Sequence, residues 1–214
     1  REGREPVMRF TLQNKEVETP MKVLIACEMS GVVRDAFLAR GHDAMSCDVL
    51  PTEKEGPHYQ GDVRDVLHYP WDMMIFHAPC THICVSGSRH FQAKRMDGRQ
   101  QSGVSFFMEL WRHGEKYIPK VAAEQPIGIM STLLRKLDQI IQPWQFGHGE
   151  TKATYLTLKG LPKLTPTDVV EGREARIHKM PPGPNRSKER SKTYTGIAKA
   201  FASQWSPDLI DISV

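Results

Sequence analysis

Short apolar runs that stop at polar or glycine-containing turns constrain this chain more than any other feature of its sequence. The run Val23–Cys27 is apolar at both alternations and is followed by Ser30 and Gly31. A strand that is apolar on both faces is typical of a parallel sheet buried between layers of helices. Residues 32–39 then place apolar side chains on one face and end at Gly41, which predicts a helix.

The same unit recurs along the chain. Further apolar or β-branched runs predict strands at 44–47, 58–60, 72–76, 120–123, 140–143 and 154–158. Helical spacing of apolar residues predicts helices through 104–111 and 196–205. Alternating strands and helices predict an α/β fold, with a mostly parallel sheet and helices on both faces. Ligands of such sheets bind beyond the carboxyl ends of the strands, so the functional site is expected there.

Length and composition fit one folded domain. A chain of 214 residues can bury one core, and its 39% hydrophobic and 25% charged residues exclude a disordered or fibrous protein. Residues 1–20 are polar and aperiodic, so we expect a flexible extension followed by a single domain over 21–214, with Met21 as the natural start. No apolar run approaches the roughly 20 residues that span a bilayer. A cytoplasmic protein with no membrane partner is therefore expected.

Positive charge is concentrated in the C-terminal part of the chain. The net charge is only +4, but residues 173–199 contain eight Lys or Arg against two Glu. Much of this segment belongs to a stretch over 160–192 that is rich in proline and charge, which predicts an irregular loop. Such a segment could lie along the phosphates of a nucleic acid or could simply be a solvated loop.

Polar residues stand where the predicted strands end. Gly31 would let the backbone approach a cofactor, and Asp48, after the second strand, could accept hydrogen bonds from both hydroxyls of a ribose. Asp62, after the third strand, could accept from an adenine amino group. Each residue alone occurs in many α/β folds, but their order favours a nucleoside-binding cleft.

Cys80 follows the strand predicted at 72–76 and is preceded by Pro79, which fixes the direction of the chain. A free thiol has a pKa of about 8.5, so only a small fraction is thiolate at neutral pH without help. His77 or His82 could raise that fraction. These features favour a nucleophile, and a small buried apolar side chain is the alternative role.

Glu124 follows the strand predicted at 120–123. A carboxylic acid in a dry pocket can hold a proton, because burial raises its pKa. A thiolate at Cys80 could then attack C6 of a pyrimidine whose N3 is protonated by Glu124, and C5 could take a methyl group from a sulfonium donor. A helix cap or a surface carboxylate is the alternative role for this glutamate.

Taken in order, these motifs resemble those of the cytosine-C5 DNA methyltransferase family in its compact phage and prophage form. The similarity runs from Met21 to about Trp205. It rests on Ser30-Gly31, Asp48, Gly61-Asp62, Pro79-Cys80 and Glu124-Gln125-Pro126. The resemblance implies a Rossmann-like class I fold that binds S-adenosylmethionine and acts on DNA. It implies Cys80 as the nucleophile and Glu124 as the group that contacts N3 of cytosine.

The resemblance also assigns further residues of the site. Arg173 and Arg176 are expected to steady the base, and the segment from Thr193 to Phe201 is similar to a motif whose helix closes over the cofactor. Cofactor contacts are expected at Glu28, Ser30, Gly31, Asp48, Asp62, Pro79 and Thr193. Substrate contacts are expected at His82, Ser86, Arg89 and Gln125, most of them in a long polar loop over 81–98.

Three departures from the family pattern keep other functions open. Ala78 replaces the first proline of Pro-Pro-Cys, and Gln125 replaces the asparagine that follows the glutamate. Only the segment 160–191 stands where larger members carry a domain that reads the DNA sequence. The alternatives are a methyltransferase that acts on RNA or a free nucleotide, and a catalytically silent protein that binds the cofactor or a nucleic acid.

A zinc site is a further alternative, since histidines and cysteines are dense around Cys80. His77, Cys80, His82 and Cys84, with His90 nearby, are all residue types that bind zinc. Their spacing matches no zinc-finger pattern, so no metal is expected. The chain has four cysteines and no secretory signal, which favours reduced thiols over disulfides.

Overall fold

A single sheet of seven strands organises the computed structural model, which describes residues 19–184 and 186–209. The strands are β1 (Lys22–Ala26), β2 (Asp43–Asp48), β3 (His58–Gln60), β4 (Met73–Phe76), β5 (Lys120–Pro126), β6 (Gln139–Ile141) and β7 (Thr154–Lys159). Their order is β3-β2-β1-β4-β5-β7-β6. The first five strands pair in parallel, and β7 runs antiparallel to both β5 and β6. This order and these directions are those of the Rossmann-like class I methyltransferase fold, which confirms the predicted fold class.

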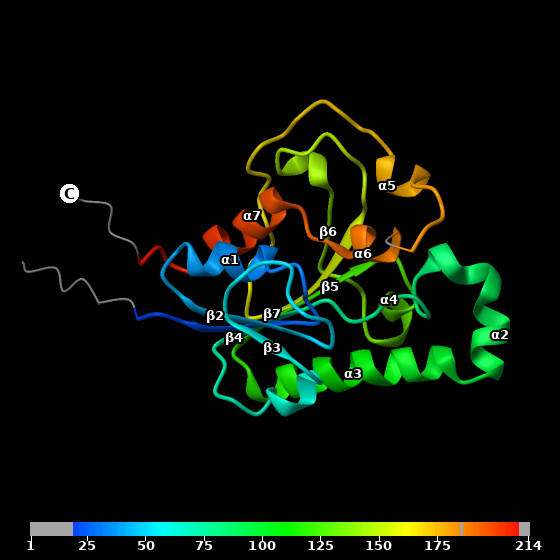
Figure 1. Ribbon diagram of the computed structural model, residues 1–214, viewed down its shortest axis with the longest axis horizontal. Coiled ribbons are helices and arrows are strands. Elements are labelled where there is room, and N and C mark those ends of the chain that lie inside the picture. The colour runs from blue at the N-terminus through cyan, green and yellow to red at the C-terminus, as the bar shows by residue number, and fades with distance from the viewer. Residues whose placement is uncertain (1–18, 185, 210–214) are drawn as a thin grey trace, which may run out of the picture.

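Helices cover both faces of the sheet (Figure 1). They are α1 (Val32–Leu38), α2 (Phe91–Met96), α3 (Arg99–Tyr117), α4 (Met130–Leu133), α5 (Arg176–Lys179), α6 (Arg186–Ser191) and α7 (Thr195–Trp205). Helices α1 and α7 lie on one face, and α3 lies along the other. None of the helices in the described ranges is both long enough and apolar enough to cross a membrane.

The core consists of two clusters, one on each face of the sheet. On the first face, Val23 and Ile25 of β1 pack with Phe37 of α1 and with the apolar side of α7. On the second face, Leu24 of β1 packs with Trp111 and other side chains of α3. Successive side chains of a strand point to opposite faces, so a strand that is apolar at every position is buried on both.

The structure contains α4, which was not predicted, and places α5 and α6 in the stretch 160–192 that was expected to be an irregular loop. It differs from the sequence-based expectations in three further places. Strand β5 continues through Glu124 to Pro126, because β7 pairs with it in antiparallel register over its whole length from Val121. The region 81–98, expected to be a polar loop, contains a 3-10 helix (Val85–His90) and α2. Strand β6 ends at Ile141 rather than at residue 143, where Pro143 begins a 3-10 helix (Pro143–Gln145) and has no N–H to donate.

Gly196 brings the first turn of α7 into backbone contact with the segment that follows β6. A Cβ at this position would overlap the carbonyl oxygen of Phe146. The Gly196 N–H donates to Nε2 of His148 at 3.0 Å. The position of α7 over the sheet therefore depends on the absence of a side chain at residue 196.

We expect Gly196→Ala to lower the free energy of unfolding by about 1–3 kcal/mol, because the added methyl group forces the helix and the loop apart. Chemical denaturation at neutral pH measures the change. Gly183→Ala is the matched control, since a Cβ there meets nothing within 4 Å, and its change should stay within about 0.5 kcal/mol. Equal losses in the two variants would contradict this account.

Candidate active site

The carboxyl ends of β4 and β5 bring His77 and Glu124 together. Phe76 of β4 pairs in register with Ala123 of β5, so the next residue of each strand lies beside the other. Nδ1 of His77 and Oε2 of Glu124 are 2.8 Å apart, and only 10% and 12% of the two side chains are exposed. The glutamate singled out from the sequence is therefore held by His77, a partner that the sequence did not predict for it.

Cys80 lies just beyond the end of β4 and is half-buried at the rim of the core on the α3 face. The pKa of its thiol is raised by a hydrogen bond with Cys84, by burial and by the negative charges of Cys84 and Glu124. The last effect means that the carboxylate of Glu124 acts electrostatically on the sulfur of Cys80. The thiol and the carboxylate thus lie at the same edge of the sheet, where β4 and β5 end side by side.

The structure corrects the protonation state that was expected for Glu124. Burial does raise its pKa, but the hydrogen bond and charge of His77, the charge of Lys152 and a hydrogen bond with Thr154 outweigh burial. The pKa of Glu124 is therefore below its ordinary value, and the side chain is ionised at neutral pH. The expectation of a neutral carboxylic acid was wrong for the protein alone, because it counted burial and not the partners.

Lys152 and Thr154 are site residues that the sequence did not reveal. Thr154 opens β7 and stands opposite Pro126 of β5, close to Glu124. Nζ of Lys152 donates to the carbonyl oxygen of Lys192 at 3.1 Å. Sequence periodicity predicted this strand but not its antiparallel pairing with β5, and only that pairing brings the two residues to Glu124.

The end of β1 presents a buried carboxylate with one oxygen free. Oε1 of Glu28 accepts from Oγ of Ser30 at 2.5 Å and from the N–H of Val33 at 3.3 Å. Oε2 of Glu28 is buried and has no hydrogen-bond partner. Gly31 follows with φ 70°, a conformation that favours glycine. Because a buried acceptor without a partner is costly, this oxygen fits a ligand that brings a donor or a positive charge.

Asp48 ends β2 and Asp62 lies two residues beyond the end of β3, and the two aspartates differ in their partners. Oδ1 of Asp48 accepts from the N–H of Leu50 at 2.9 Å. Asp62 uses both oxygens on Arg64, accepting from its backbone N–H and from its guanidinium, each at 2.9 Å. These bonds lower the pKa of Asp62. Neighbouring Cys27 adopts φ 58°, which is uncommon for a residue with a side chain and typical of functional sites.

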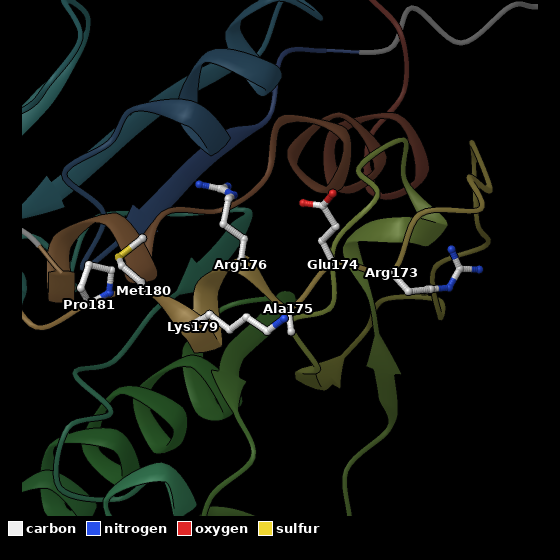
Figure 2. A pocket seen from close by; sticks show the side chains of 7 residues that line it. All are labelled: Arg173, Glu174, Ala175, Arg176, Lys179, Met180 and Pro181. Carbon is white, nitrogen blue, oxygen red and sulfur yellow. The ribbon is translucent and has the colours of Figure 1, made fainter.

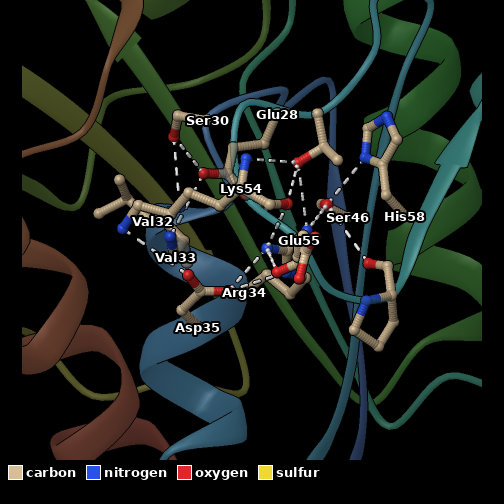
Figure 3. A network of polar contacts seen from close by, with 12 residues as sticks. Glu28, Ser30, Val32, Val33, Arg34, Asp35, Ser46, Lys54, Glu55 and His58 are labelled. Atoms are coloured by element: carbon tan, nitrogen blue, oxygen red, sulfur yellow. Dashed lines mark hydrogen bonds and ion pairs between the residues drawn. The ribbon is translucent and has the colours of Figure 1, made fainter.

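A fully buried arginine ties the loop after β2 to α1 (Figure 3). The guanidinium of Arg34 forms an ion pair with Asp35 at 2.8 Å. Its other hydrogen bonds go to the hydroxyls of Ser46 and Thr52 and to the carbonyl oxygens of Lys54 and Glu55. A Cβ at Gly31 or Gly56 would overlap this guanidinium. The loop that follows Asp48 is therefore fixed against the helix that follows Gly31.

The same loop is joined to the basic segment near the C-terminus. The carboxylate of Glu53 forms ion pairs with Lys188 at 2.7 Å and with Lys192 at 2.9 Å. Both bonds lower the pKa of Glu53. Thr193, one of the expected cofactor contacts, follows directly and is half-buried. Part of the positive charge seen in the sequence is thus balanced within the protein.

Arg173 and Arg176, expected to steady the base, have other partners in this structure. The guanidinium of Arg173 lies 3.9 Å from the centre of the Trp144 ring, and that of Arg176 is 2.6 Å from Glu150. Figure 2 shows the two side chains pointing in different directions. They belong to an open pocket of about 650 Å³, lined by Arg173, Glu174, Ala175, Arg176, Lys179, Met180 and Pro181.

The residues expected to contact substrate are spread over the region around Cys80. Ser86 lies 3.1 Å from the sulfur of Cys84, and Arg89 is exposed and donates to the ring of His90. Nδ1 of His82 is buried without a partner. Gln125 is buried on the face of β5 opposite to Glu124, as strand alternation requires. These four contacts stay predictions.

The cluster of histidines and cysteines is not arranged as a metal centre. Across 19–184 and 186–209, no three or more His, Cys, Asp or Glu side chains are grouped so as to hold a metal ion. All four cysteines are free thiols. Nδ1 of His77 is bound to Glu124, and the sulfur of Cys84 contacts Oγ of Ser86.

Comparison with known proteins gives a distant structural similarity. No family model and no curated protein matches the sequence. The chain is similar to the solved structure of the Entamoeba histolytica methyltransferase EhMeth, with a TM-score of 0.47 and 14% identity over 79% of this chain and 62% of that one. It is also similar to the S. pombe Dnmt2 methyltransferase, with a TM-score of 0.45 and 12% identity over 74% and 54%. The chain spans less than two thirds of either protein. Similarities of this size do not assign an activity, and the fold class rests on the strand order and directions described above.

We expect Glu124→Gln to lower the free energy of unfolding by about 1 kcal/mol at neutral pH, because the amide cannot form the charged contact with His77. The pKa of Glu124 is depressed in the folded state, so its contribution is full above the ordinary glutamate value of about 4.3 and is lost as pH falls through the folded-state value. Urea denaturation at several pH values should show the deficit shrinking on acidification. Exposed Glu115→Gln is the control, and a deficit independent of pH would argue against the ion pair.

Proposed function

We propose that this protein is an S-adenosylmethionine-dependent methyltransferase that modifies C5 of cytosine in DNA, with Cys80 as the nucleophile. The observation that carries the proposal is that Cys80, beyond β4, and Glu124, near the end of β5, lie at the same edge of the sheet, because β4 and β5 pair in parallel register. A nucleophilic sulfur and a carboxylate that can face N3 are the two groups that such a reaction asks of the protein.

The ends of β1 and β2 offer groups that fit the cofactor. The free buried oxygen of Glu28 suits its positively charged amino acid part, and Asp48 can accept from the ribose hydroxyls. Gly31 leaves room for close approach of the backbone. When bound, the cofactor supplies a methyl group activated by a sulfonium. Asp62 would accept from the adenine amino group with carboxylate oxygens that also accept hydrogen bonds from Arg64.

The protein's own residues supply the activation of the base. Cys80 must lose its proton to add to C6, and the ring then needs a proton at N3. Glu124 is ionised at rest, but its 2.8 Å contact with His77 gives a route for that proton. When His77 carries a hydrogen on both nitrogens, the hydrogen on Nδ1 can pass to Glu124 and then to N3. This route replaces the neutral glutamic acid that the sequence suggested.

The choice of DNA as substrate follows from the sequence resemblance and from the basic C-terminal segment. A cytosine must leave its stack to reach Cys80, whether it comes from duplex DNA, single-stranded DNA or RNA. The segment 160–192 offers little structure for base-specific reading in a groove, since its helices are α5 and α6, of four and six residues. RNA and a silent binding protein are the competing outcomes of the test below.

With labelled cofactor and duplex DNA, single-stranded DNA or RNA supplied separately, we expect label at C5 of cytosine in DNA. Cys80→Ser should lower the rate by about 100-fold or more, because a hydroxyl is a far weaker nucleophile. Cys47→Ala, which removes a thiol buried elsewhere in the core, should keep the rate of the parent. Label in RNA alone would show that RNA is the substrate in place of DNA. No label in any polymer would contradict the proposal.

Calorimetric titration with S-adenosylhomocysteine tests the cofactor cleft by itself. Asp48→Ala should weaken binding by roughly 10- to 100-fold, as expected for losing hydrogen bonds to a charged group. Asp43→Ala is the matched control, because Asp43 lies exposed at the opposite end of the same strand. Unchanged affinity in the Asp48 variant would place the cofactor elsewhere.

A further inference from the structure

The segment 173–181, which lines the open pocket of Figure 2, is attached to the chain just before β7. The N–H of Glu174 donates to the carbonyl oxygen of Gly149 at 2.9 Å, and the N–H of Thr151 donates to the carbonyl oxygen of Glu174 at 2.8 Å. Three residues beyond Thr151, β7 begins and pairs with β5, which carries Glu124. The pocket therefore borders the place where a base would meet Glu124.

Arg173 presents a fixed and exposed guanidinium. Its central carbon lies 3.9 Å from the centre of the Trp144 ring, so the cation covers one face of the indole. A terminal nitrogen of the same group donates to the carbonyl oxygens of Val170 and Gly172. These contacts hold the group in place although the residue is exposed to solvent. A guanidinium plane that is both fixed and exposed is a surface on which an unpaired base stacks.

Positive charge continues along the same segment. Three of the seven lining residues are basic, and Glu174 is acidic. The carboxylate of Glu150 pairs with Arg176 at 2.6 Å through one oxygen and accepts from the hydroxyl of Tyr194 at 2.7 Å through the other. Only 16% of the Glu150 side chain is exposed, whereas 58% of Arg176 is exposed. Lys179 is exposed as well. Exposed cations beside a fixed stacking surface fit a phosphate backbone.

We propose that the segment 173–181 binds single-stranded nucleic acid on one side of the target base, with a flanking base stacked on Arg173 and the phosphates held by Arg176 and Lys179. The role of this strand as the substrate rests on the proposed function, whereas its binding does not. Single-stranded DNA and RNA share the chemistry that the surface recognises, namely unpaired bases on a phosphate backbone.

A duplex fits this surface less well than a single strand does. The bases of a duplex are stacked on one another, so none of them has a face free for Arg173. Reading a duplex in its major groove needs a helix or a β-ribbon that enters the groove. The helix of this segment, α5, has only four residues, and the surface around it is a pocket. A single strand also reaches the site without the free energy that flipping a base out of a duplex costs.

The test is the binding of a fluorescently labelled oligonucleotide of about 12 nucleotides, followed by anisotropy over a series of salt concentrations. The same sequence is supplied as single-stranded DNA, as duplex DNA and as single-stranded RNA. We expect single-stranded DNA to bind about tenfold or more tightly than the duplex, because only the single strand offers bases for stacking. RNA that binds more tightly than single-stranded DNA would support the surface and contradict DNA as the substrate.

Two variants separate stacking from charge. Arg173→Lys keeps the charge and removes the plane, so affinity for the single strand should fall about tenfold with an unchanged slope of log affinity against log salt. Lys179→Ala should make this slope less steep by about 0.7, the value for one phosphate contact of a single strand. Lys116→Ala is the matched control, since this exposed lysine lies in the last turn of α3, near the start of β5. Its affinity and slope should equal those of the parent.

Equal or tighter binding of the duplex would overturn the proposal. Binding of the single strand by both Arg173→Lys and Lys179→Ala at the affinity and slope of the parent would overturn it too. The assay uses neither cofactor nor methyl transfer, so a protein that shows these effects but labels no cytosine loses only the proposed function. Conversely, methylation of duplex DNA at a rate that is independent of Arg173 and Lys179 would contradict this inference and leave the proposed function intact.

Discussion

The parallel pairing of β2, β1, β4 and β5 is the constraint on which the rest of the structure depends. Parallel neighbours finish at the same edge, so the residues after each strand meet there however far apart they lie in sequence. Glu28, Asp48, Cys80 and Glu124 reach one side of the molecule for this reason. The helices that connect the strands bury both faces, and therefore this edge is the place left for polar chemistry.

Charge inside this edge is paired rather than isolated. Glu124 is ionised because His77, Lys152 and Thr154 together outweigh its burial. Arg34 is fully buried, and each side of its guanidinium has an acceptor from the loop that follows β2. In the described part of the chain, few buried side-chain nitrogen and oxygen atoms lack a hydrogen-bond partner. Two of these atoms, Oε2 of Glu28 and Nε2 of His77, lie at the strand ends.

Elements that depend on local residue spacing were predicted from the sequence, whereas features that depend on contacts between distant residues were not. The strand β1 and the helix α1 were predicted closely, since their apolar spacing is a local pattern. The helix α2 was missed because its six residues are too few to show a helical spacing of apolar side chains, and in the structure the ammonium of Lys94 from this helix donates to the carbonyl oxygen of Thr81. Arg173 and Arg176 were assigned from the family resemblance, and the structure gives them Trp144 and Glu150 as partners.

The sequence by itself determined the fold class and the order of the strand ends, and it singled out Cys80 and Glu124 as reacting groups, which stays a prediction. It could do so because apolar periodicity and turn residues act over a few positions. Only the tertiary structure decided the state of those groups. The pKa of Glu124 is lowered by His77, which parallel pairing of β4 and β5 places beside it, and by Lys152 and Thr154, which the antiparallel pairing of β7 with β5 brings close. Electrostatic effects depend on distances in space, which residue order along the chain does not contain.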